Sequence, residues 1–429
     1  MKKYFFCLLI VLLAVPASAI DIKDVELGGQ IRFRGYDIQN VWDFDDDTDT
    51  DNISTFRHKT SLFLNVKADE NITGYIKLSN QNYGESGASA KDFYEDNRSN
   101  KIFVDNAYID IHNLFHSNLD LKLGRQNLFY GSGFVIADGQ SQMASTSVYF
   151  DGARLRWNIS DAVTLDALYF KDQENTTNEA AEDDVTLTGV YFTSGKTPVI
   201  GGKQELYILN RNDENLKKDI FLYGARLSDK FKSGLDYSAE IGIQTGDFNA
   251  TTDQDALGYK LDLGYTFNNV SIKPRFFIGY ASLSGNDPNT ADNESWDVFY
   301  GGWPQFGDLL AWKFVNIGGG NNISSYDPSY NSGSSYFGEA VFSNLHIATA
   351  GIGTKLFEKI SVKASYSMLT IDETAADDDF GDYYQVSVKY PYSKSLSFAA
   401  YAAMIDPGDA FGTDTDKATE FFWEASFNF

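Results

Sequence analysis

The stretch Phe150–Trp157 reads FDGARLRW and alternates basic with apolar side chains. Arg154 and Arg156 occupy every second position, and Ala153, Leu155 and Trp157 lie between and beside them. In a β-strand, successive side chains point to opposite faces. The segment is therefore expected to be a strand with one apolar face and one strongly basic face.

The same period of two continues along the whole chain. It recurs in TSLFLNVKA (60–68), YKLDLGYTF (259–267) and YYQVSVKY (383–390). No Pro-rich or Ser/Gly-rich linker and no change in the pattern of residues divides the sequence. We predict an all-β fold in a single domain with about eighteen strands. The expected strands span residues 26–38, 54–68, 72–82, 101–112, 118–128, 146–157, 162–172, 184–194, 203–211, 218–231, 235–248, 256–268, 270–283, 345–357, 360–371, 381–391, 395–405 and 418–429.

The lengths of these segments and of their connections indicate a membrane barrel. Each strand has about ten residues or more, the length that a tilted strand needs to cross a bilayer. Links after even-numbered strands are mostly tight, as at 69–71 and 358–359, whereas links after odd-numbered strands are mostly longer, as from about 284 to 344. This pattern predicts a transmembrane antiparallel β-barrel of a Gram-negative-type outer membrane, with short periplasmic turns and long extracellular loops.

The first nineteen residues differ from the rest. MKKYFFCLLIVLLAVPASA contains Lys2 and Lys3, an apolar run and the small residues Ala17-Ser18-Ala19. These are the parts of a secretory signal peptide with its cleavage site. We expect residues 1–19 to be that signal peptide and residues 20–429 to form the barrel.

Embedding in a membrane decides which way the arginines point. A charge on the lipid face costs about 2–4 kcal/mol at the midplane, so the apolar member of each alternating pair should face lipid. Parity then sends a basic set into the lumen: Arg32, Arg34, Arg57, Lys59, Lys67, Lys77, Lys122, Arg154, Arg156, Arg226, Lys260, Lys273, Arg275, Lys363 and Lys389. Acidic residues at inward positions are about half as many, namely Asp110, Asp120, Asp166, Glu205, Glu240, Asp262 and Glu424.

The formal net charge of −25 is compatible with a basic lumen. The acid is expected mainly in the long loops, in clusters at 43–51, 179–184, 247–255, 287–297, 373–382 and 406–416. So negative a chain is not expected to bind nucleic acid. A basic lumen predicts a passage for anions, because the planar guanidinium group of arginine pairs with carboxylates. Many weak binding sites in series allow a bound solute to dissociate and continue through the channel. The alternative is that these charges form ion-pair networks that fill the barrel.

The chain also resembles the alginate export family of outer-membrane porins. The similarity is densest over 118–157, where LDLKLGRQNLFYGSG precedes FDGARLRW, and extends to LGGQIRFRG (27–35), FRHKTSLFLNV (56–66) and WDVFYGGWPQFGDLLAW (296–312). The resemblance implies an eighteen-stranded barrel whose constricted, positively charged lumen secretes an anionic uronate polysaccharide. It also implies pore-lining roles for Arg32, Arg34, Arg57, Arg125, Arg154 and Arg156.

Arg125 is the residue for which parity and resemblance disagree. Parity groups it with Leu119, Leu121 and Leu123 on the lipid face, unless a bulge or the nearby strand end turns it inward. Parity and resemblance together give ten candidate pore-lining residues: Arg32, Arg34, Arg57, Lys59, Arg125, Arg154, Arg156, Arg226, Lys273 and Arg275.

The expected function is an outer-membrane channel that passes anionic solutes or an anionic, uronate-type polysaccharide. The alternatives are a general diffusion porin and a plugged structural or adhesion barrel. The expected partners are outer-membrane lipid and lipopolysaccharide, the transported anion and periplasmic export proteins. No cofactor, catalytic residue or enzymatic activity is expected, since no Ser/His pair is singled out.

Two loop segments leave other interpretations open. Asp47, Asp49 and Asp51 have the spacing of a calcium loop, but Asn52 and His58 replace the required Gly and Glu. We expect a solvated loop without a specific metal site; the alternative is loose bridging of divalent ions to lipopolysaccharide. The aromatic segment 296–317 is expected either to fold into the lumen as a constriction or to cap the barrel on its own aromatics.

Overall fold

The computed structural model describes residues 24–41, 44–47, 52–83, 102–137, 150–174, 184–195, 202–301, 309–310, 343–375, 377–413 and 415–429. The expected signal peptide, residues 1–19, lies outside these residues.

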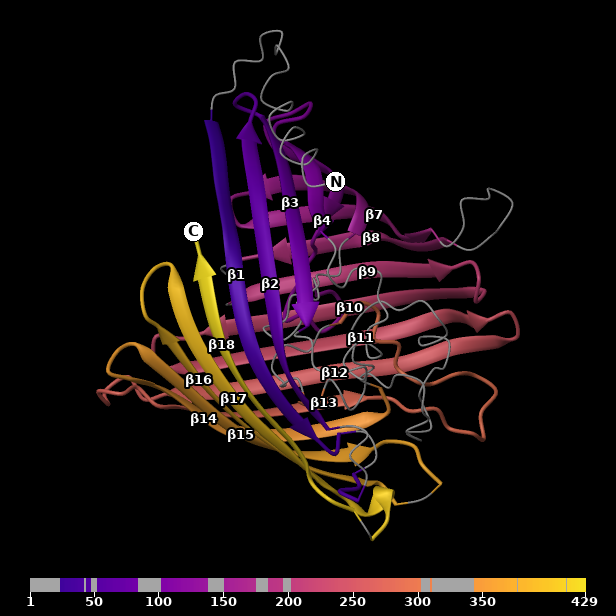
Figure 1. The fold of residues 1–429 in the computed structure, drawn as a ribbon. Coiled ribbons are helices and arrows are strands. Elements are labelled where there is room, and N and C mark those ends of the chain that lie inside the picture. The colour runs from indigo at the N-terminus through magenta and orange to yellow at the C-terminus, as the bar shows by residue number, and fades with distance from the viewer. Residues whose placement is uncertain are drawn as a thin grey trace, which may run out of the picture.

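Within these described residues, eighteen antiparallel strands form one closed sheet (Figure 1). Each strand pairs with its neighbours in the sequence, and β1 closes the barrel by pairing with β18, which confirms the predicted fold. The strands are β1 (Asp24–Gln39), β2 (Ile53–Lys67), β3 (Ile72–Tyr83), β4 (Ile102–Ile111), β5 (Leu119–Gln126), β6 (Phe150–Ser160), β7 (Val163–Glu174), β8 (Asp184–Ser194), β9 (Lys203–Asp213), β10 (Lys218–Lys230), β11 (Leu235–Asn249), β12 (Thr252–Thr266), β13 (Arg275–Leu283), β14 (Leu345–Leu356), β15 (Ile360–Ile371), β16 (Asp379–Pro391), β17 (Leu396–Pro407) and β18 (Ala418–Asn428).

The connections mostly alternate in length, but the links after β8 and β12, residues 195–202 and 267–274, are longer than the other links after even-numbered strands. The links after β6 and β14 are short, whereas the link between β13 and β14 spans residues 284–344. Residues 214–217 and 250–251 are tight links although they follow odd-numbered strands. The acidic cluster expected in a loop at 247–255 therefore lies mostly in the paired ends of β11 and β12.

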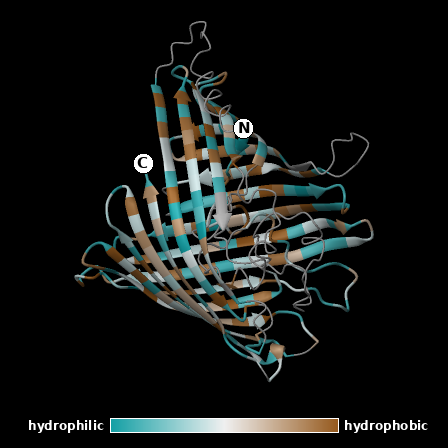
Figure 2. Ribbon diagram, in the orientation of Figure 1, coloured by the Kyte–Doolittle hydropathy of each residue, from teal (hydrophilic) through white to brown (hydrophobic). Residues whose placement is uncertain are grey.

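The outer face carries the apolar member of each alternating pair. On β11, β12 and β13, large apolar side chains are exposed at every second position: Ile241, Ile243, Leu261, Leu263, Phe276 and Ile278. Figure 2 shows this alternation of hydrophobic and hydrophilic residues along the strands. Within the described ranges, no helix has the length and hydrophobicity needed to cross a bilayer.

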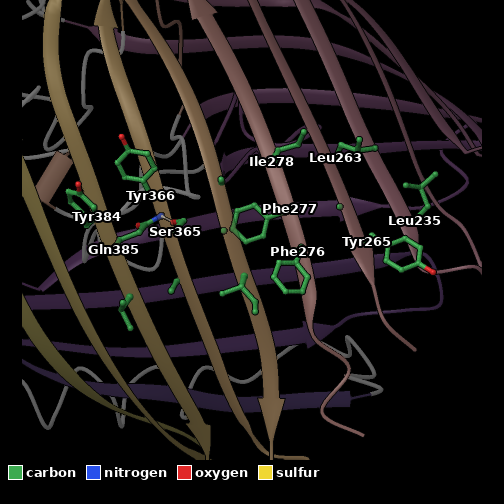
Figure 3. A pocket seen from close by; sticks show the side chains of 16 residues that line it. Leu235, Leu263, Tyr265, Phe276, Phe277, Ile278, Ser365, Tyr366, Tyr384 and Gln385 are labelled. Carbon is green, nitrogen blue, oxygen red and sulfur yellow. Dashed lines mark hydrogen bonds between the residues drawn. The ribbon is translucent and has the colours of Figure 1, made fainter. Parts of the chain in front are cut away.

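A groove of about 740 Å³ interrupts the apolar outer face over β11–β16 (Figure 3). The small residues Ala350 and Ala364 line it between the larger Ile278 and Tyr366. Because its lining is almost wholly apolar, the groove belongs to the lipid-facing surface and gathers no set of polar groups.

Two segments that follow β5 and β13 fold back against the inner wall of the barrel. Residues 127–137 and 284–301 are joined by backbone hydrogen bonds: Ala137 N donates to Tyr300 O over 2.7 Å, and Tyr300 N donates to Val135 O over 3.0 Å. We call these two ranges the inward segments. They narrow the lumen on the side of β6–β12, where their apolar side chains and the inner wall form a buried core.

Trp296 anchors the second inward segment. Its side chain is buried, and its ring stacks on Phe134 with centroids 5.3 Å apart. It also lies over Gly242 and Gly258 of the inner wall, where a Cβ would approach the ring to 2.8 and 2.7 Å. Of the two expectations for the aromatic segment, the inward-folded one holds for residues 296–301; residues 302–308 and 311–317 lie outside the described residues.

The assignment of the two strand faces predicts opposite effects of adjacent substitutions on β16. Val386 is 45% exposed on the outer face, and Ser387 points inward. Val386→Arg should lower the free energy of unfolding by about 2–4 kcal/mol, because it places a charge in lipid. Ser387→Arg should change it by about 0.5 kcal/mol. Urea unfolding in lipid vesicles measures both, and equal losses would contradict the assignment.

Candidate functional site

Four basic side chains gather on the inner wall where the sheet closes. Arg32 and Arg34 of β1 lie opposite Lys59 and Arg57 of β2 in the strand register. All four are buried. Like charges placed directly opposite each other destabilise a sheet. Their placement therefore has a cost for folding, and such a cost is typical of a site kept for function.

Glu424 of β18 partly balances this group. Arg34 Nε donates to Glu424 Oε2 over 2.9 Å, and Arg32 Nε lies 3.7 Å from the same oxygen. The Arg34 guanidinium also lies 4.6 Å from the centroid of the Phe422 ring. Among the contacts of the described residues, one carboxylate thus serves two guanidinium groups.

The two arginines of the opening stretch have different environments. Arg156 makes a two-pronged ion pair with Asp166, with N–O distances of 2.7 and 2.6 Å, and Tyr130 donates to the same carboxylate over 2.6 Å. Arg154 makes no hydrogen bond or ion pair within the described part of the chain. It lies directly opposite Lys122 of β5. Arg156 therefore fastens an inward segment to the wall, whereas Arg154 presents its charge to the lumen.

Arg226 and Arg275 also point inward and are neutralised there. Arg226 lies between Glu205, to which it donates, and Glu240, whose carboxylate is 3.5 Å from its Nε. Arg275 makes a two-pronged pair with Asp236, with N–O distances of 2.9 and 2.5 Å. These arginines follow the alternative expectation, in which lumen charges form structural ion pairs.

Two residues of the predicted pore-lining set are not on the inner wall. Arg125 lies on the outer face, where it pairs with Asp151, its register partner on β6, over 2.8 and 2.6 Å. No bulge turns it inward, and the carboxylate compensates its charge. Lys273 lies exposed in the turn before β13 with a φ of 42°, because Pro274 delays the start of the strand that was predicted from residue 270.

Several inward charges were missed by the parity prediction. Asp105 of β4 is unpaired in the register between the pairs Lys77↔Asn106 and Leu78↔Val104, which is a β-bulge. The bulge turns both Asp105 and Asn106 inward, and Lys77 pairs with Asp105 over 2.8 Å. Other missed inward charges, which simple parity could have found, are Lys203, Arg211, Asp213, Lys218, Asp236 and Glu420.

Asp297 of the second inward segment is a charge that no strand pattern could reveal. Its carboxylate lies 3.0 Å from Lys218 Nζ and 3.4 Å from an Arg211 nitrogen. Gln244 of β11 donates to the Asp297 carbonyl over 2.6 Å and accepts from its N–H over 2.8 Å. Burial alone would raise the pKa of Asp297, but Lys218 and Arg211 outweigh it and hold the pKa below its usual 3.8.

The acidic loop after β1 brings three carboxylates together. Oxygens of Asp45, Asp46 and Asp416 lie within 4.8 Å of one another. A hydrogen bond with Asp416 raises the pKa of Asp46. Asp45 and Asp46 are exposed, and exposed acidic groups of this kind are common without a bound ion. Asp49 and Asp51 of the calcium-loop pattern lie outside the described residues.

Residues 81–424 match the model of the alginate export family. The chain belongs to this family. No curated protein matches the sequence.

The fold is shared with solved porin structures. The barrel is similar to OccAB4 of Acinetobacter baumannii (13% identity, TM-score 0.58, 96% of this chain and 100% of that chain). It is similar to a BenF-like porin of Pseudomonas fluorescens (10% identity, TM-score 0.60, 95% and 99%) and to OccK2 of Pseudomonas aeruginosa in complex with glucuronate (11% identity, TM-score 0.56, 95% and 98%). The family and the shared fold place the chain in the outer membrane as a porin-like barrel, with lipid and lipopolysaccharide around it.

The ion pairs of Asp297 predict an acid-sensitive constriction. Because docking lowers the pKa of Asp297, the released segment binds a proton more tightly than the docked one. The ion pairs of Asp297 therefore stabilise docking fully at pH values above 3.8, the usual pKa of an aspartate. Their contribution is lost as the pH falls below that value. Single-channel conductance should stay constant near neutral pH and rise below that value.

Substitutions test which carboxylate is responsible. Asp297→Asn removes the buried carboxylate that faces Lys218 and Arg211, so it should weaken docking, raise conductance at neutral pH and remove the acid response. Asp292→Asn, an exposed acid of the same segment, should leave both unchanged. Equal conductance of Asp297→Asn and the unmodified barrel would show that these ion pairs do not hold the constriction.

Proposed function

We propose that the barrel conducts anionic solutes, and that a uronate-type polysaccharide belongs to the class that it passes. The observation that carries this proposal is the convergence of basic side chains from β1, β2, β5 and β6 on one lumen. Arg154 is central to it, because it points inward, lies opposite Lys122 and is engaged in no ion pair with a described residue.

The opposed cations of the inner wall have both a cost and a benefit in a water-filled pore. Opposed cations such as Arg32 and Lys59 destabilise the sheet. The same cations attract carboxylates, and the planar arginine fork matches a carboxylate with two parallel hydrogen bonds. Several moderate sites along a channel let an anion enter and leave again, which conduction requires.

The relatives support the class of solute. The family that the chain belongs to is described as alginate export, and alginate is a polymer of uronates. One of the solved barrels with this fold, OccK2, was determined in complex with glucuronate, which is itself a uronate. We further propose that residues 1–19 direct export and that periplasmic proteins deliver the polymer to the short-turn side.

The inward segments favour a second candidate function, a barrel that is plugged at rest. They occupy the lumen beside β6–β12, and the buried core that they form with the wall has the packing of a stable element. A plugged barrel would give no steady conductance, so the experiment that tests the first proposal also separates the second.

The test is the reversal potential of the refolded barrel in a planar bilayer under a salt gradient. The unmodified barrel should select anions. Arg154→Ser should lower the anion-to-cation permeability ratio roughly two- to fivefold, since one charge a few Å from the ion path contributes up to about 1 kcal/mol in water.

Arg125→Ser is the matched control. It removes the same charge from the neighbouring strand β5 but on the outer face, and should leave the ratio unchanged. Cation selectivity of the unmodified barrel would overturn the anion channel. A folded barrel without conductance would favour the plugged one.

A further inference from the structure

Three aromatic rings form a stack on the inner wall across β2, β3 and β4. The rings of Phe63 and Tyr75 are 5.7 Å apart between centroids and inclined by 22°. The rings of Tyr75 and Tyr108 are 5.0 Å apart and inclined by 18°. Phe63 has the same parity on β2 as the inward Lys59, and Tyr75 has the same parity on β3 as Lys77. The stack therefore lines the lumen.

Cationic groups continue this stack onto β5 and β6. The Lys122 ammonium lies 4.0 Å from the centroid of the Tyr108 ring, on the side of β5, and 2.8 Å from the Asp110 carboxylate. Arg154 is the register partner of Lys122. The wall thus presents, in order, two phenols, an ammonium and a guanidinium.

The phenols of this row are available as hydrogen-bond donors. Within the described part of the chain, the hydroxyl groups of Tyr75 and Tyr108 make no hydrogen bond, and both side chains are partly exposed. Because each ring is held face to face with a neighbour, neither can turn its edge away from the lumen at low cost. The row is a preorganised set of donors.

Next to Tyr108 the wall carries two glycines. Gly124 is the register partner of Tyr108, and Gly152 is the register partner of Gly124. Gly124 has a φ of +117°, and a Cβ there would lie 2.3 Å from the Ala107 carbonyl oxygen, so only glycine fits. Gly124 therefore adds no side chain beside the Tyr108 ring, whereas Gly152 lies against the side chain of the buried Phe170.

We propose that the row formed by Tyr75, Tyr108, Lys122 and Arg154 is a binding subsite for one sugar residue of an anionic polysaccharide, an inference that rests on the proposed function. The carboxylate of the sugar binds Arg154 and Lys122, and its hydroxyl groups accept from the phenols of Tyr75 and Tyr108. A simple inorganic anion would leave the phenols unused, and a neutral sugar would leave Arg154 without a counter-charge. A polyhydroxylated carboxylate satisfies both kinds of donor.

The place of the subsite agrees with a role at the periplasmic entrance. Tyr75 is three residues after the start of β3 at Ile72, which puts it about 10 Å from the short turn. The inward segments border the subsite, since Tyr130 binds Asp166, the partner of Arg156. A polymer held here is positioned beside the constriction that it has to pass.

Equilibrium dialysis of a labelled mannuronate tetrasaccharide against the full barrel in detergent tests the subsite. The double variant Tyr75→Phe/Tyr108→Phe keeps the ring stack and removes only the two hydroxyl groups. It should weaken binding about tenfold, as expected for the loss of two ordinary hydrogen bonds. Tyr169→Phe, on the outer face of β7 with 60% exposure, should bind like the unmodified barrel.

The binding and conductance experiments distinguish an error in the proposed subsite from an error in the proposed channel function. Unchanged affinity in the double variant, or equal binding of an uncharged tetrasaccharide by the unmodified barrel, would overturn the subsite and leave the anion channel standing. Tight, hydroxyl-dependent binding of the tetrauronate by a barrel that proves cation-selective would support the subsite and overturn the proposed function.

Discussion

A lipid environment that accepts neither charges nor unpaired backbone groups is the constraint on which the rest of this structure depends. The sheet meets it by closing: β1 pairs with β18 as well as with β2, so no strand edge is left. Because side chains alternate along each strand, one face of every strand contacts lipid. The charged residues lie mainly on the other face, which lines the lumen. The charged interior is a consequence of placing charge where water can solvate it.

Charge inside the lumen is divided between two tasks. Arg226, between Glu205 and Glu240, and Arg156, paired with Asp166, are neutralised and hold the wall and the inward segments together. Arg154 has no such partner among the described residues, and its charge faces the lumen. Arginine thus occurs in two settings on the inner wall, and the neighbouring carboxylates distinguish them.

The inward segments turn a wide barrel into a narrowed one by filling it with apolar side chains and a few buried ion pairs. Trp296 enters because Gly242 and Gly258 leave room in the wall, and Asp297 is held by charges of β9 and β10. The constriction and the basic wall therefore border each other, an arrangement that agrees with the proposed passage of anionic solutes.

The sequence by itself determined the strands, their faces and the closed barrel, because period-two alternation is a local pattern that a membrane forces onto every strand. It also correctly predicted that eight of the ten candidate residues point inward. Arg125 lies on the outer face, as its position in the alternation predicts, and pairs there with Asp151. Lys273 lies in a turn because Pro274 delays the start of β13. Only the tertiary structure decided the rest. The bulge at Asp105, the ion partners of each arginine and the docking of Asp297 depend on contacts between segments far apart in the chain, and no local pattern encodes them.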